Sequence, residues 1–387
     1  MSTRVRIFMV LAALLAAGGA AALEPAPQAT AASLPPIRHV FIIVLENESY
    51  AASFGAQSAA PYLATTLTSE GALLSQYYGI GHSSLDNYIA LISGQAPNRD
   101  TQLDCADFTD FRLSALGLDA HGQAHGEGCV YPGIVRTLPN QLTAAGLTWK
   151  AYMEDMGNNP RREAATCAHV AIGAHEATHL AQVGDQYAAR HNPFVYFHSI
   201  IDDQAGCDAH VVNLARLPQD LKTSASTANY IFITPNLCND GHDGHDGVCV
   251  DGRRGGLTAI DGFLRRWVPL ITHSPAFLAD GMLVVTFDES DGSGAEGSSA
   301  CCGELPLPGA AFQPGFKGPG GGRIGAVVLS PFVQPGTVTA EPYNHYSLLR
   351  TVEMIFGLSP LGYAGAPHLQ VFGPDVFTGA AQHPRAQ

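Results

Sequence analysis

The stretch His39–Tyr50, HVFIIVLENESY, decides the fold, because five apolar residues in it lead directly into a carboxylate and an amide. Val40–Val44 are mostly β-branched, which is typical of a strand buried on both faces of a parallel sheet. Glu46 and Asn47 follow the end of that strand. Ligands of open α/β sheets bind at the carboxyl ends of strands, so this pair is a candidate oxygen-rich metal site. A plain polar junction between strand and loop is the alternative.

Apolar segments typical of strands and helices alternate from residue 37 onward. The other expected strands are Leu147–Met153, Tyr230–Thr234, Met282–Phe287 and Ile324–Leu329. The expected helices are Ala60–Gly71, a helix that starts just after Ser84 and ends at Gly94, Thr137–Ala145, Gly262–Ile271 and Tyr346–Phe356. This alternation predicts an α/β fold in one domain over residues 37–387, with a doubly wound, mostly parallel sheet and helices on both faces.

Three segments do not follow this pattern. Residues 100–130 and 155–210 are irregular and contain cysteines, so we interpret them as insertions over one face of the sheet. Residues 291–323 are dense in Gly, Pro and Ser and form a long loop between the last two strands. Loops of that length are usually functional or mobile.

Composition excludes one large class of function. The chain has 387 residues, of which 46% are hydrophobic and 14% charged, enough for one large domain. Its net charge is −14, and it offers no basic patch to nucleic acid or to an anionic membrane surface. We therefore expect no nucleic-acid partner. Sequence does not fix the oligomeric state.

The N-terminus has the three parts of a secretory signal peptide. Arg4 and Arg6 precede an apolar run, Ile7–Ala17, and small residues end at Ala22, where we expect cleavage. A retained membrane anchor is the alternative, but the run is shorter than the roughly 20 residues that span a bilayer. Residues 23–36, rich in Ala and Pro, then form a flexible linker. The sequence thus predicts a secreted or periplasmic protein without an integral membrane segment after signal removal.

Export gives the eight cysteines a structural meaning, because an oxidising compartment favours disulfides and an even count leaves none over. A metal site is a weak alternative, since no Cys-x-x-Cys spacing occurs. Sequence alone does not prove connectivity. Proximity in the chain suggests the pairs Cys105–Cys129, Cys167–Cys207, Cys238–Cys249 and the vicinal Cys301–Cys302.

The segment Gly81–Gly94, GHSSLDNYIALISG, places two serines where a helix is expected to begin. A hydroxyl at a helix N-terminus faces backbone amides that can hold a phosphate group. Ser84 is therefore a candidate nucleophile and Asn87 a candidate donor to phosphate oxygens. The ordinary alternative is that Ser84 is an N-cap residue.

Three more polar groups follow strands or precede a helix. The loop after Thr234, TPNLCNDGHDGHD, is too rich in amides, carboxylates and imidazoles for a plain turn, and it lacks the regular spacing of a calcium loop. Asp288 and Glu289 end another strand, and their charges repel each other unless a cation or proton lies between them. His345 precedes the last helix and either caps structure or binds metal. In a wound sheet such positions converge at one edge, which predicts a metal-assisted esterase or phosphoesterase.

Five motifs in this order resemble the phosphoesterase family of secreted acid phosphatases and phospholipases C. They are HVFIIVLENESY, HSSLDNYIALISG, PNLCNDGHDGH, VVTFDESDG and NHYSLLRTVEMIFGL, which together span residues 39–358. The resemblance implies an alkaline phosphatase-like fold. The chain is similar in particular to secreted actinobacterial acid phosphatases that act on phosphoinositides.

The resemblance also assigns site residues. The metal ligands of the family fall on Glu46, Asn47, Asp288 and Glu289. The usual turn, His-Pro-Ser-x-Pro-Asn-Tyr, falls on residues 82–88, where both prolines are replaced, so the nucleophile falls on Ser84 with Ser83 as a possible substitute. The remaining matched positions, which include a possible second metal or phosphate site, are Asn236, Asp240, His242 and His345.

The implied mechanism has two steps. A bound metal lowers the pKa of the Ser84 hydroxyl, the serine becomes transiently phosphorylated, and water then releases phosphate. Asn87 holds phosphate oxygens, while His82, His242 and His345 stabilise charge or protonate the leaving group. The oxygen-rich ligand set suits Mg²⁺, Ca²⁺ or Mn²⁺, with Zn²⁺ also compatible.

The expected partner is a small phosphorylated substrate or a phospholipid headgroup. Two alternatives remain open from sequence. One is a phosphodiesterase of the phospholipase C type, which would differ from a monoesterase in its pocket for the leaving group. The other is a non-catalytic, metal-stabilised binding module, which would not need Ser84 beside a full set of ligands.

Overall fold

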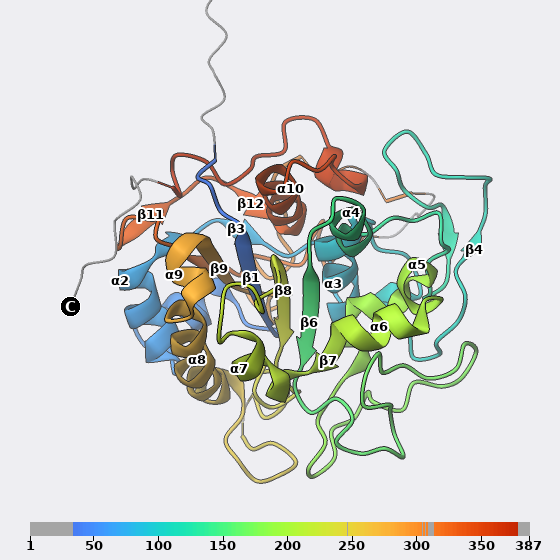
Figure 1. Cartoon of the computed structure of the whole chain (residues 1–387), viewed down its shortest axis with the longest axis horizontal. Coiled ribbons are helices and arrows are strands. Elements are labelled where there is room, and N and C mark those ends of the chain that lie inside the picture. Colours follow the sequence, from blue (N-terminus) through green and yellow to red (C-terminus); the bar gives the residue numbers. More distant parts are fainter. Residues whose placement is uncertain (1–33, 246, 304, 306, 309–312, 378–387) are drawn as a thin grey trace, which may run out of the picture. The chain divides into compact units, whose positions relative to one another are not determined.

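The centre of the protein is an eight-stranded sheet with β1 (His39–Leu45) in its middle, as the computed structural model shows (Figure 1). The structure describes residues 34–377 except 246, 304, 306 and 309–312. The strand order is β11-β2-β10-β9-β1-β8-β6-β7. The other strands of this sheet are β2 (Ala72–Leu74), β6 (Trp149–Met153), β7 (Val211–Asn213), β8 (Tyr230–Thr234), β9 (Gly281–Phe287), β10 (Ala326–Leu329) and β11 (Thr337–Thr339).

The sheet is mostly parallel, as predicted. Strand β10 alone in it runs antiparallel to its neighbours, β9 and β2, and the other pairings are parallel. Every residue of β1, β8 and β9 is buried, which explains their continuous apolar sequences. The predicted α/β fold with a doubly wound, mostly parallel sheet is confirmed.

Helices cover both faces of the sheet (Figure 1). On one side α3 (Ser84–Ser93) packs against α10 (His345–Ile355) and α4 (Leu138–Ala144). On the other side α8 (Gly256–Thr272) packs against η1 (Tyr62–Leu67) and α9 (Pro275–Asp280). Helix α3 ends at Gly94, whose φ of 67° is left-handed and where a Cβ would lie 2.2 Å from the Leu361 carbonyl oxygen. The predicted glycine stop therefore has a steric cause.

The predicted elements differ from the observed ones mainly at their ends. Helix α8 begins six residues before the expected Gly262, and the helix expected at Ala60–Gly71 is a π-helical segment, η1, continued by α2 (Thr68–Glu70). Strands β2, β7 and β11 were not predicted, because three residues carry too little periodicity to indicate a strand. The remaining elements are short: α1 (Tyr50–Phe54), β3 (Tyr77–Tyr78), β12 (Tyr343–Asn344), η5 (Leu214–Arg216), α7 (Leu217–Asp220) and η6 (Gly362–Gly365).

The two cysteine-bearing insertions have little regular structure. Residues 100–130 hold η2 (Thr101–Leu103) and the hairpin of β4 (Arg112–Leu113) and β5 (Gly126–Glu127). Residues 155–210 hold η3 (Ala189–His191), η4 (Pro193–Tyr196), α5 (His198–Ile201) and α6 (Gln204–His210). All four suggested disulfides are present: Cys105–Cys129, Cys167–Cys207, Cys238–Cys249 and Cys301–Cys302.

Several predictions concern residues beyond those described. The signal peptide (1–22) and most of the linker (23–36) lie outside the described residues, as does Asp246 of the polar loop after β8. The described residues from Leu34 onward form one compact unit. Within the described part of the chain, no helix is long and apolar enough to cross a membrane. The division into signal, linker and one phosphoesterase domain stays a prediction.

Candidate active site

The parallel register of β1 and β9 brings two acids together. Leu45 pairs with Phe287, so Glu46 and Asp288 leave the two strands at the same level of the sheet. The Asp288 amide donates to the Leu45 carbonyl at 2.8 Å, and the Asn47 amide donates to Asp288 Oδ1 at 3.1 Å. The Asn47 side chain also donates to Glu289 Oε1 at 3.0 Å. The structure therefore groups the four residues predicted as metal ligands.

Ser84 joins this group through its hydroxyl. It is the first residue of α3, and its Oγ donates to Glu46 Oε2 at 2.8 Å while the Tyr88 hydroxyl donates to Glu46 Oε1 at 2.6 Å. Ser83 is the N-cap residue of the helix, and its hydroxyl donates to the Gln102 carbonyl at 3.1 Å. Ser84 is therefore not the N-cap, and of the two serines it is the one that contacts the acids.

Asn87 has a different place from the predicted one. Its Oδ1 accepts hydrogen bonds from the Ile80 and Gly81 amides at 2.7 and 3.2 Å. Its Nδ2 donates to the Gly81 and Ser83 carbonyls at 3.0 and 3.2 Å. The side chain is fully buried, and its amide is used to hold the turn before α3. This corrects the expected contact with phosphate oxygens, because the donors are already occupied by backbone.

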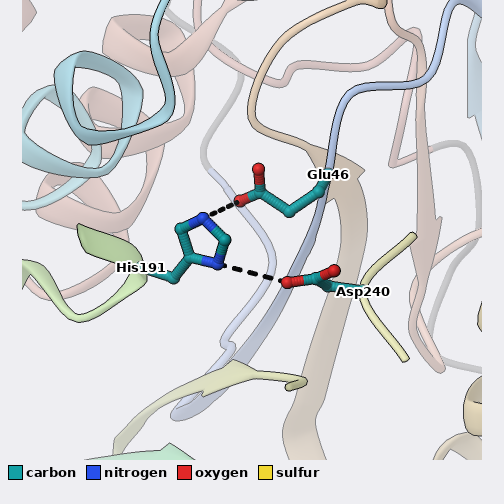
Figure 2. A group of neighbouring side chains, drawn as sticks. All are labelled: Glu46, His191 and Asp240. Carbon is teal, nitrogen blue, oxygen red and sulfur yellow. Dashed lines mark hydrogen bonds and ion pairs between the residues drawn. The ribbon is translucent and has the colours of Figure 1, made fainter. Parts of the chain in front are cut away.

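The loop after β8 adds a fourth acid, Asp240, and the insertion adds an imidazole. The Asp240 carbonyl accepts from the Glu46 amide at 2.9 Å, which fixes the loop beside β1. His191 lies between the two acids, with Nδ1 3.1 Å from Asp240 Oδ2 and Nε2 3.4 Å from Glu46 Oε1 (Figure 2). The ligand atoms of these three buried residues lie within 4.8 Å of one another. They are a candidate metal-binding group that shares Glu46 with the predicted one.

Sequence reasoning missed His191. It lies in η3, within an insertion whose pattern indicated only irregular structure, and no motif surrounds it. Its ring stacks on Tyr88 of α3, with centroids 5.3 Å apart and planes inclined by 12°. Burial, followed by the nearby Arg190 charge, lowers the pKa of His191 well below its ordinary value. The ring is therefore neutral and can donate through only one nitrogen.

The acids at this site are held in an environment that opposes their charge. Burial raises the pKa of Glu46 well above its ordinary value, and the charges of Asp288 and Asp240 raise it further. Burial also raises the pKa of Asp240 and Glu289, and that of Asp288 to about 6. Buried carboxylates in contact keep their negative charge only beside a cation, so the cluster needs either protons or a metal ion.

Two other histidines near the strand ends, His345 and His82, contact residues of the acid cluster. His345 donates from Nε2 to the Asp288 carbonyl at 2.6 Å and has Nδ1 3.2 Å from the Tyr77 hydroxyl. Burial lowers its pKa to about 4, so the ring is neutral with both nitrogens occupied. His82 donates from Nε2 to the Gly297 carbonyl at 2.7 Å, and its Nδ1 contacts Glu289. In this geometry both rings position acids.

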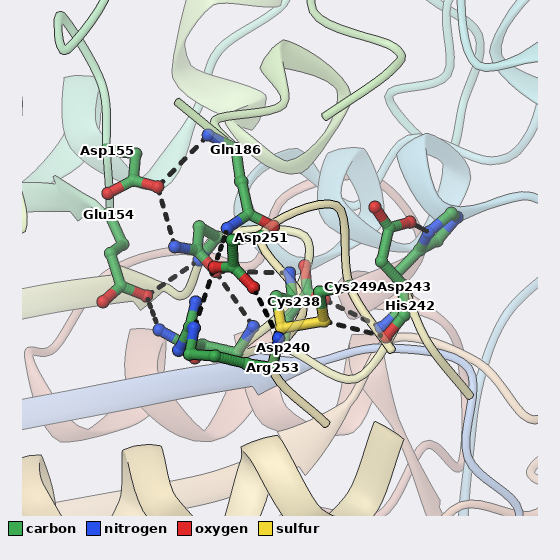
Figure 3. The surroundings of a disulfide bond; sticks show 12 residues. Glu154, Asp155, Gln186, Cys238, Asp240, His242, Asp243, Cys249, Asp251 and Arg253 are labelled. Atoms are coloured by element: carbon green, nitrogen blue, oxygen red, sulfur yellow. Dashed lines mark hydrogen bonds and ion pairs between the residues drawn. A yellow bond between two sulfur atoms is a disulfide. The ribbon is translucent and has the colours of Figure 1, made fainter. Parts of the chain in front are cut away.

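His242 lies at the side of the site that opens to a cavity. Its Nδ1 is 2.8 Å from Asp243 Oδ1, and Arg190 donates to its Nε2 at 3.2 Å. Asn236 points elsewhere, because its side chain donates to Asp155 Oδ2 at 2.7 Å, and Asn239 donates to Glu154 at 2.9 Å. Figure 3 shows these two acids, Glu154 and Asp155, near the Cys238–Cys249 disulfide. Asn236, Asp240, His242 and His345 therefore do not come together as one second site, because each faces a different partner.

A cavity of about 530 Å³ opens in front of these residues. It is lined by Asn47, Ser83, Ser84, Asp104, His242, His245, Glu289, Ser290, Asp291, Ser293 and Phe316. Its volume lies in the range of small-molecule sites. The site thus contains a serine hydroxyl that is hydrogen-bonded to a carboxylate, with buried acids and imidazoles around it and a cavity in front of it. These are the components of metal-assisted ester hydrolysis.

Comparison with known protein families agrees with this chemistry. A model of the phosphoesterase family matches residues 56–359. The chain belongs to the phosphoesterase family. This phosphoesterase is a hydrolase that acts on phosphoric ester bonds. The matched range begins after Glu46 and Asn47, so their assignment to the site depends on the structure.

Two named relatives show how far the similarity of this phosphoesterase extends. The phosphatidylinositol-3-phosphatase of Mycobacterium tuberculosis is 27% identical over 355 residues, covering 92% of this chain and 88% of that protein. The phosphate-repressible acid phosphatase of Penicillium chrysogenum is 25% identical over 296 residues, covering 76% of this chain and 54% of that protein. The phosphoesterase thus spans about half the length of the fungal relative.

Solved structures resemble the phosphoesterase more distantly. A member of the alkaline phosphatase superfamily from Vibrio parahaemolyticus has a TM-score of 0.47 and 11% identity, covering 83% of this chain and 67% of that one. A phosphonate monoester hydrolase from Silicibacter pomeroyi has a TM-score of 0.46 and 12% identity, covering 88% and 77%. The fold class rests on the sheet itself.

Proposed function

We propose that this phosphoesterase is a metal-dependent phosphate monoesterase in which Ser84 is the nucleophile. The observation that carries the proposal is the 2.8 Å hydrogen bond from the Ser84 hydroxyl to Glu46, inside a cluster of buried acids that borders the cavity. The names of the relatives, acid phosphatases and a phosphatidylinositol phosphatase, support a monoester substrate. Among the residues that the structure describes, no contact favours a phospholipase C-type diesterase.

The donor set fits a divalent cation. Asp288 Oδ2 and His191 Nε2 are buried and have no hydrogen-bond partner. When Nδ1 of His191 donates to Asp240, its Nε2 lone pair faces a Glu46 oxygen at 3.4 Å, an arrangement that is repulsive unless a cation or a proton lies between the two atoms. Two ligand atoms about 2.1 Å from one tetrahedral cation lie about 3.4 Å apart. Carboxylates with one imidazole suit Mn²⁺ or Zn²⁺ as well as Mg²⁺ or Ca²⁺.

The residues that would hold the metal are Glu46, Asp288, Asn47 and Glu289, with the adjacent group of Glu46, His191 and Asp240 as a second candidate. When bound, a cation there would lower the pKa of the serine hydroxyl and offset charge on phosphate oxygens. His345 and His82 hold the Asp288 backbone and the Glu289 side chain in place. These two imidazoles keep the candidate metal ligands in position.

The chain supplies the nucleophile and the proton acceptor. Ser84 Oγ forms a bond to phosphorus while the bond from phosphorus to the leaving oxygen breaks, and the serine proton passes towards Glu46 Oε2, its hydrogen-bond acceptor. A water molecule then attacks phosphorus and loses a proton to the imidazole that had protonated the leaving oxygen, the Oγ–phosphorus bond breaks, Oγ recovers its proton from Glu46, and phosphate leaves. His242, whose side chain is 34% exposed and lines the cavity, is the imidazole placed to meet the leaving group.

We further propose that the phosphoesterase works outside the cytoplasm, as a secreted or periplasmic enzyme. Four disulfides support an oxidising compartment. Fractionation of cells that express the full chain, followed by assay of each fraction, tests this proposal. Activity confined to the cytoplasm, with free thiols, would contradict it.

Ser84→Ala tests the nucleophile, and Ser83→Ala is its matched control. Ser84→Ala should remove the great majority of phosphate release from p-nitrophenyl phosphate while melting temperature changes little, because one hydroxyl and no core volume is lost. Ser83→Ala should retain most turnover. Acid quenching during turnover, followed by peptide mass spectrometry, should find phosphate on Ser84. Retained turnover in Ser84→Ala would leave activated water as the attacking group.

A further inference from the structure

Phe316 places an aromatic ring at the mouth of the cavity. It lines the same cavity as Ser84, and it is 68% exposed. Single exposed apolar side chains are common on protein surfaces, so exposure alone says little. What makes Phe316 unusual is that its ring is held in one orientation beside the site.

Two sets of contacts fix this ring. It stacks on His82, with centroids 4.1 Å apart and planes inclined by 6°. The backbone before it is anchored, because the Pro314 carbonyl accepts from the His82 amide at 2.8 Å and Gly315 donates to Gly318 at 3.0 Å. One face of the ring lies on His82, and the Phe316 side chain nevertheless remains 68% exposed. A held aromatic face of this kind is a stacking platform.

The charges around the cavity restrict what can lie on that platform. Asp104, Asp291 and Glu289 line it, and none of the described residues in its lining is Lys or Arg. Its basic side chains are His242 and His245. Arg190, which contacts His242, is itself only 4% exposed. Carboxylates disfavour further negative charge on the leaving group and accept hydrogen bonds from N–H groups.

We propose that Phe316 is a substrate-binding residue, and that the leaving group carries a flat heteroaromatic ring that stacks on it, as in a nucleoside monophosphate. The inference rests on the proposed monoesterase function and names its substrate class. A cavity of about 530 Å³ accommodates a ligand of this size. Amino N–H groups of the base would meet the carboxylates at the rim, and the phosphate would meet Ser84. A leaving group with a second phosphate would meet repulsion there.

The test compares two substrates that share a primary phosphate ester and differ only in the base. The kcat/KM of the wild-type enzyme for adenosine 5′-monophosphate should exceed that for ribose 5-phosphate by roughly tenfold, the effect expected of one stacked base. Phe316→Leu should reduce this ratio to near one, because it keeps apolar volume and removes the aromatic face. Phe316→Tyr is the matched control and should preserve the ratio.

Three results would overturn the inference. They are equal kcat/KM for the two substrates in wild type, an equal loss for both substrates in Phe316→Leu, and a higher kcat/KM for a short-chain phosphatidylinositol 3-phosphate than for adenosine 5′-monophosphate. Each leaves the proposed monoesterase intact when ribose 5-phosphate is still hydrolysed with dependence on Ser84. Absence of Ser84-dependent hydrolysis of any monoester would instead refute the proposed function.

Discussion

His191 offers the sharpest test of metal binding, because its two nitrogens have separate tasks. Nδ1 lies 3.1 Å from Asp240, and Nε2 faces Glu46 without a hydrogen bond. Asn carries an amide near the position of Nδ1 and has nothing at Nε2. His191→Asn therefore keeps the donor to Asp240 and removes the candidate metal ligand.

The expected magnitude follows from linkage. Loss of a residue that hydrogen-bonds a metal ligand lowers metal affinity by about 10- to 100-fold. Loss of a ligand itself should therefore lower it by at least about 100-fold. At a metal concentration 100 times the wild-type Kd, binding stabilises the wild type by about 2.7 kcal/mol. A 100-fold weaker variant gains only about 0.4 kcal/mol at that concentration. At about 2 °C per kcal/mol, the metal-induced rise in Tm should fall from about 5 °C to about 1 °C.

The assay is thermal unfolding of the apoenzyme with Mg²⁺, Ca²⁺, Mn²⁺ and Zn²⁺ added separately, so that no step depends on activity. His210→Asn is the control, because His210 stacks on Trp149 with centroids 4.4 Å apart and is not part of the site. It should leave the metal-induced shift unchanged. An equal shift in His191→Asn and wild type would show that His191 serves Asp240 alone and binds no cation.

Two further predictions follow from buried polar groups. Asn87→Ala should lower the free energy of unfolding by about 1–3 kcal/mol, because it leaves the backbone groups of the turn before α3 without partners. Denaturant unfolding measures this loss. An unchanged unfolding midpoint would contradict the role assigned to Asn87. Burial raises the pKa of Glu353 to about 8, so the folded state favours the protonated form of this side chain. The free energy of unfolding of the wild type should therefore fall as pH rises from about 4.5 through 8. Glu353→Gln keeps an acceptor for the Leu361 amide. In parallel Tm measurements this variant should be more stable than the wild type at pH 8, with a smaller difference at pH 5. Identical dependence of Tm on pH in the two proteins would refute the pKa shift.

Much of the fold was predictable because buried strands have a strong local signal. The strand at Val40–Val44 and the apolar run Met282–Phe287 are continuous in sequence, and each leads directly into acids. Adjacent parallel strands then bring Glu46 and Asp288 together by register alone. The position of Ser84 was likewise predictable from the helix start, although Ser83 proved to be the N-cap. Local pattern and topology were sufficient for these residues.

The remainder of the site depends on contacts that no local pattern encodes. The amide of Asn87 could have faced either substrate or backbone, and only the fold of residues 80–83 shows that backbone takes all of it. His345 precedes a helix as predicted, yet its ring is used behind Asp288 because Tyr77 and a carbonyl occupy both nitrogens. Asn236 is in the predicted loop, but its amide turns to Asp155. Sequence placed these residues near the site without giving the direction of their side chains.

His191 shows why an insertion can complete a site. Residues 155–210 leave the sheet after β6 and return at β7, the edge strand, so the insertion lies at the same carboxyl ends where Glu46 and Asp240 emerge. Its conformation is held by the Cys167–Cys207 disulfide and by buried contacts such as the stacking of His191 on Tyr88. A neutral imidazole between two buried acids would add a nitrogen ligand to an otherwise oxygen-rich candidate site. Under the proposed metal dependence, the insertion would influence which cation the site prefers, while the strands of the sheet determine where the acids lie.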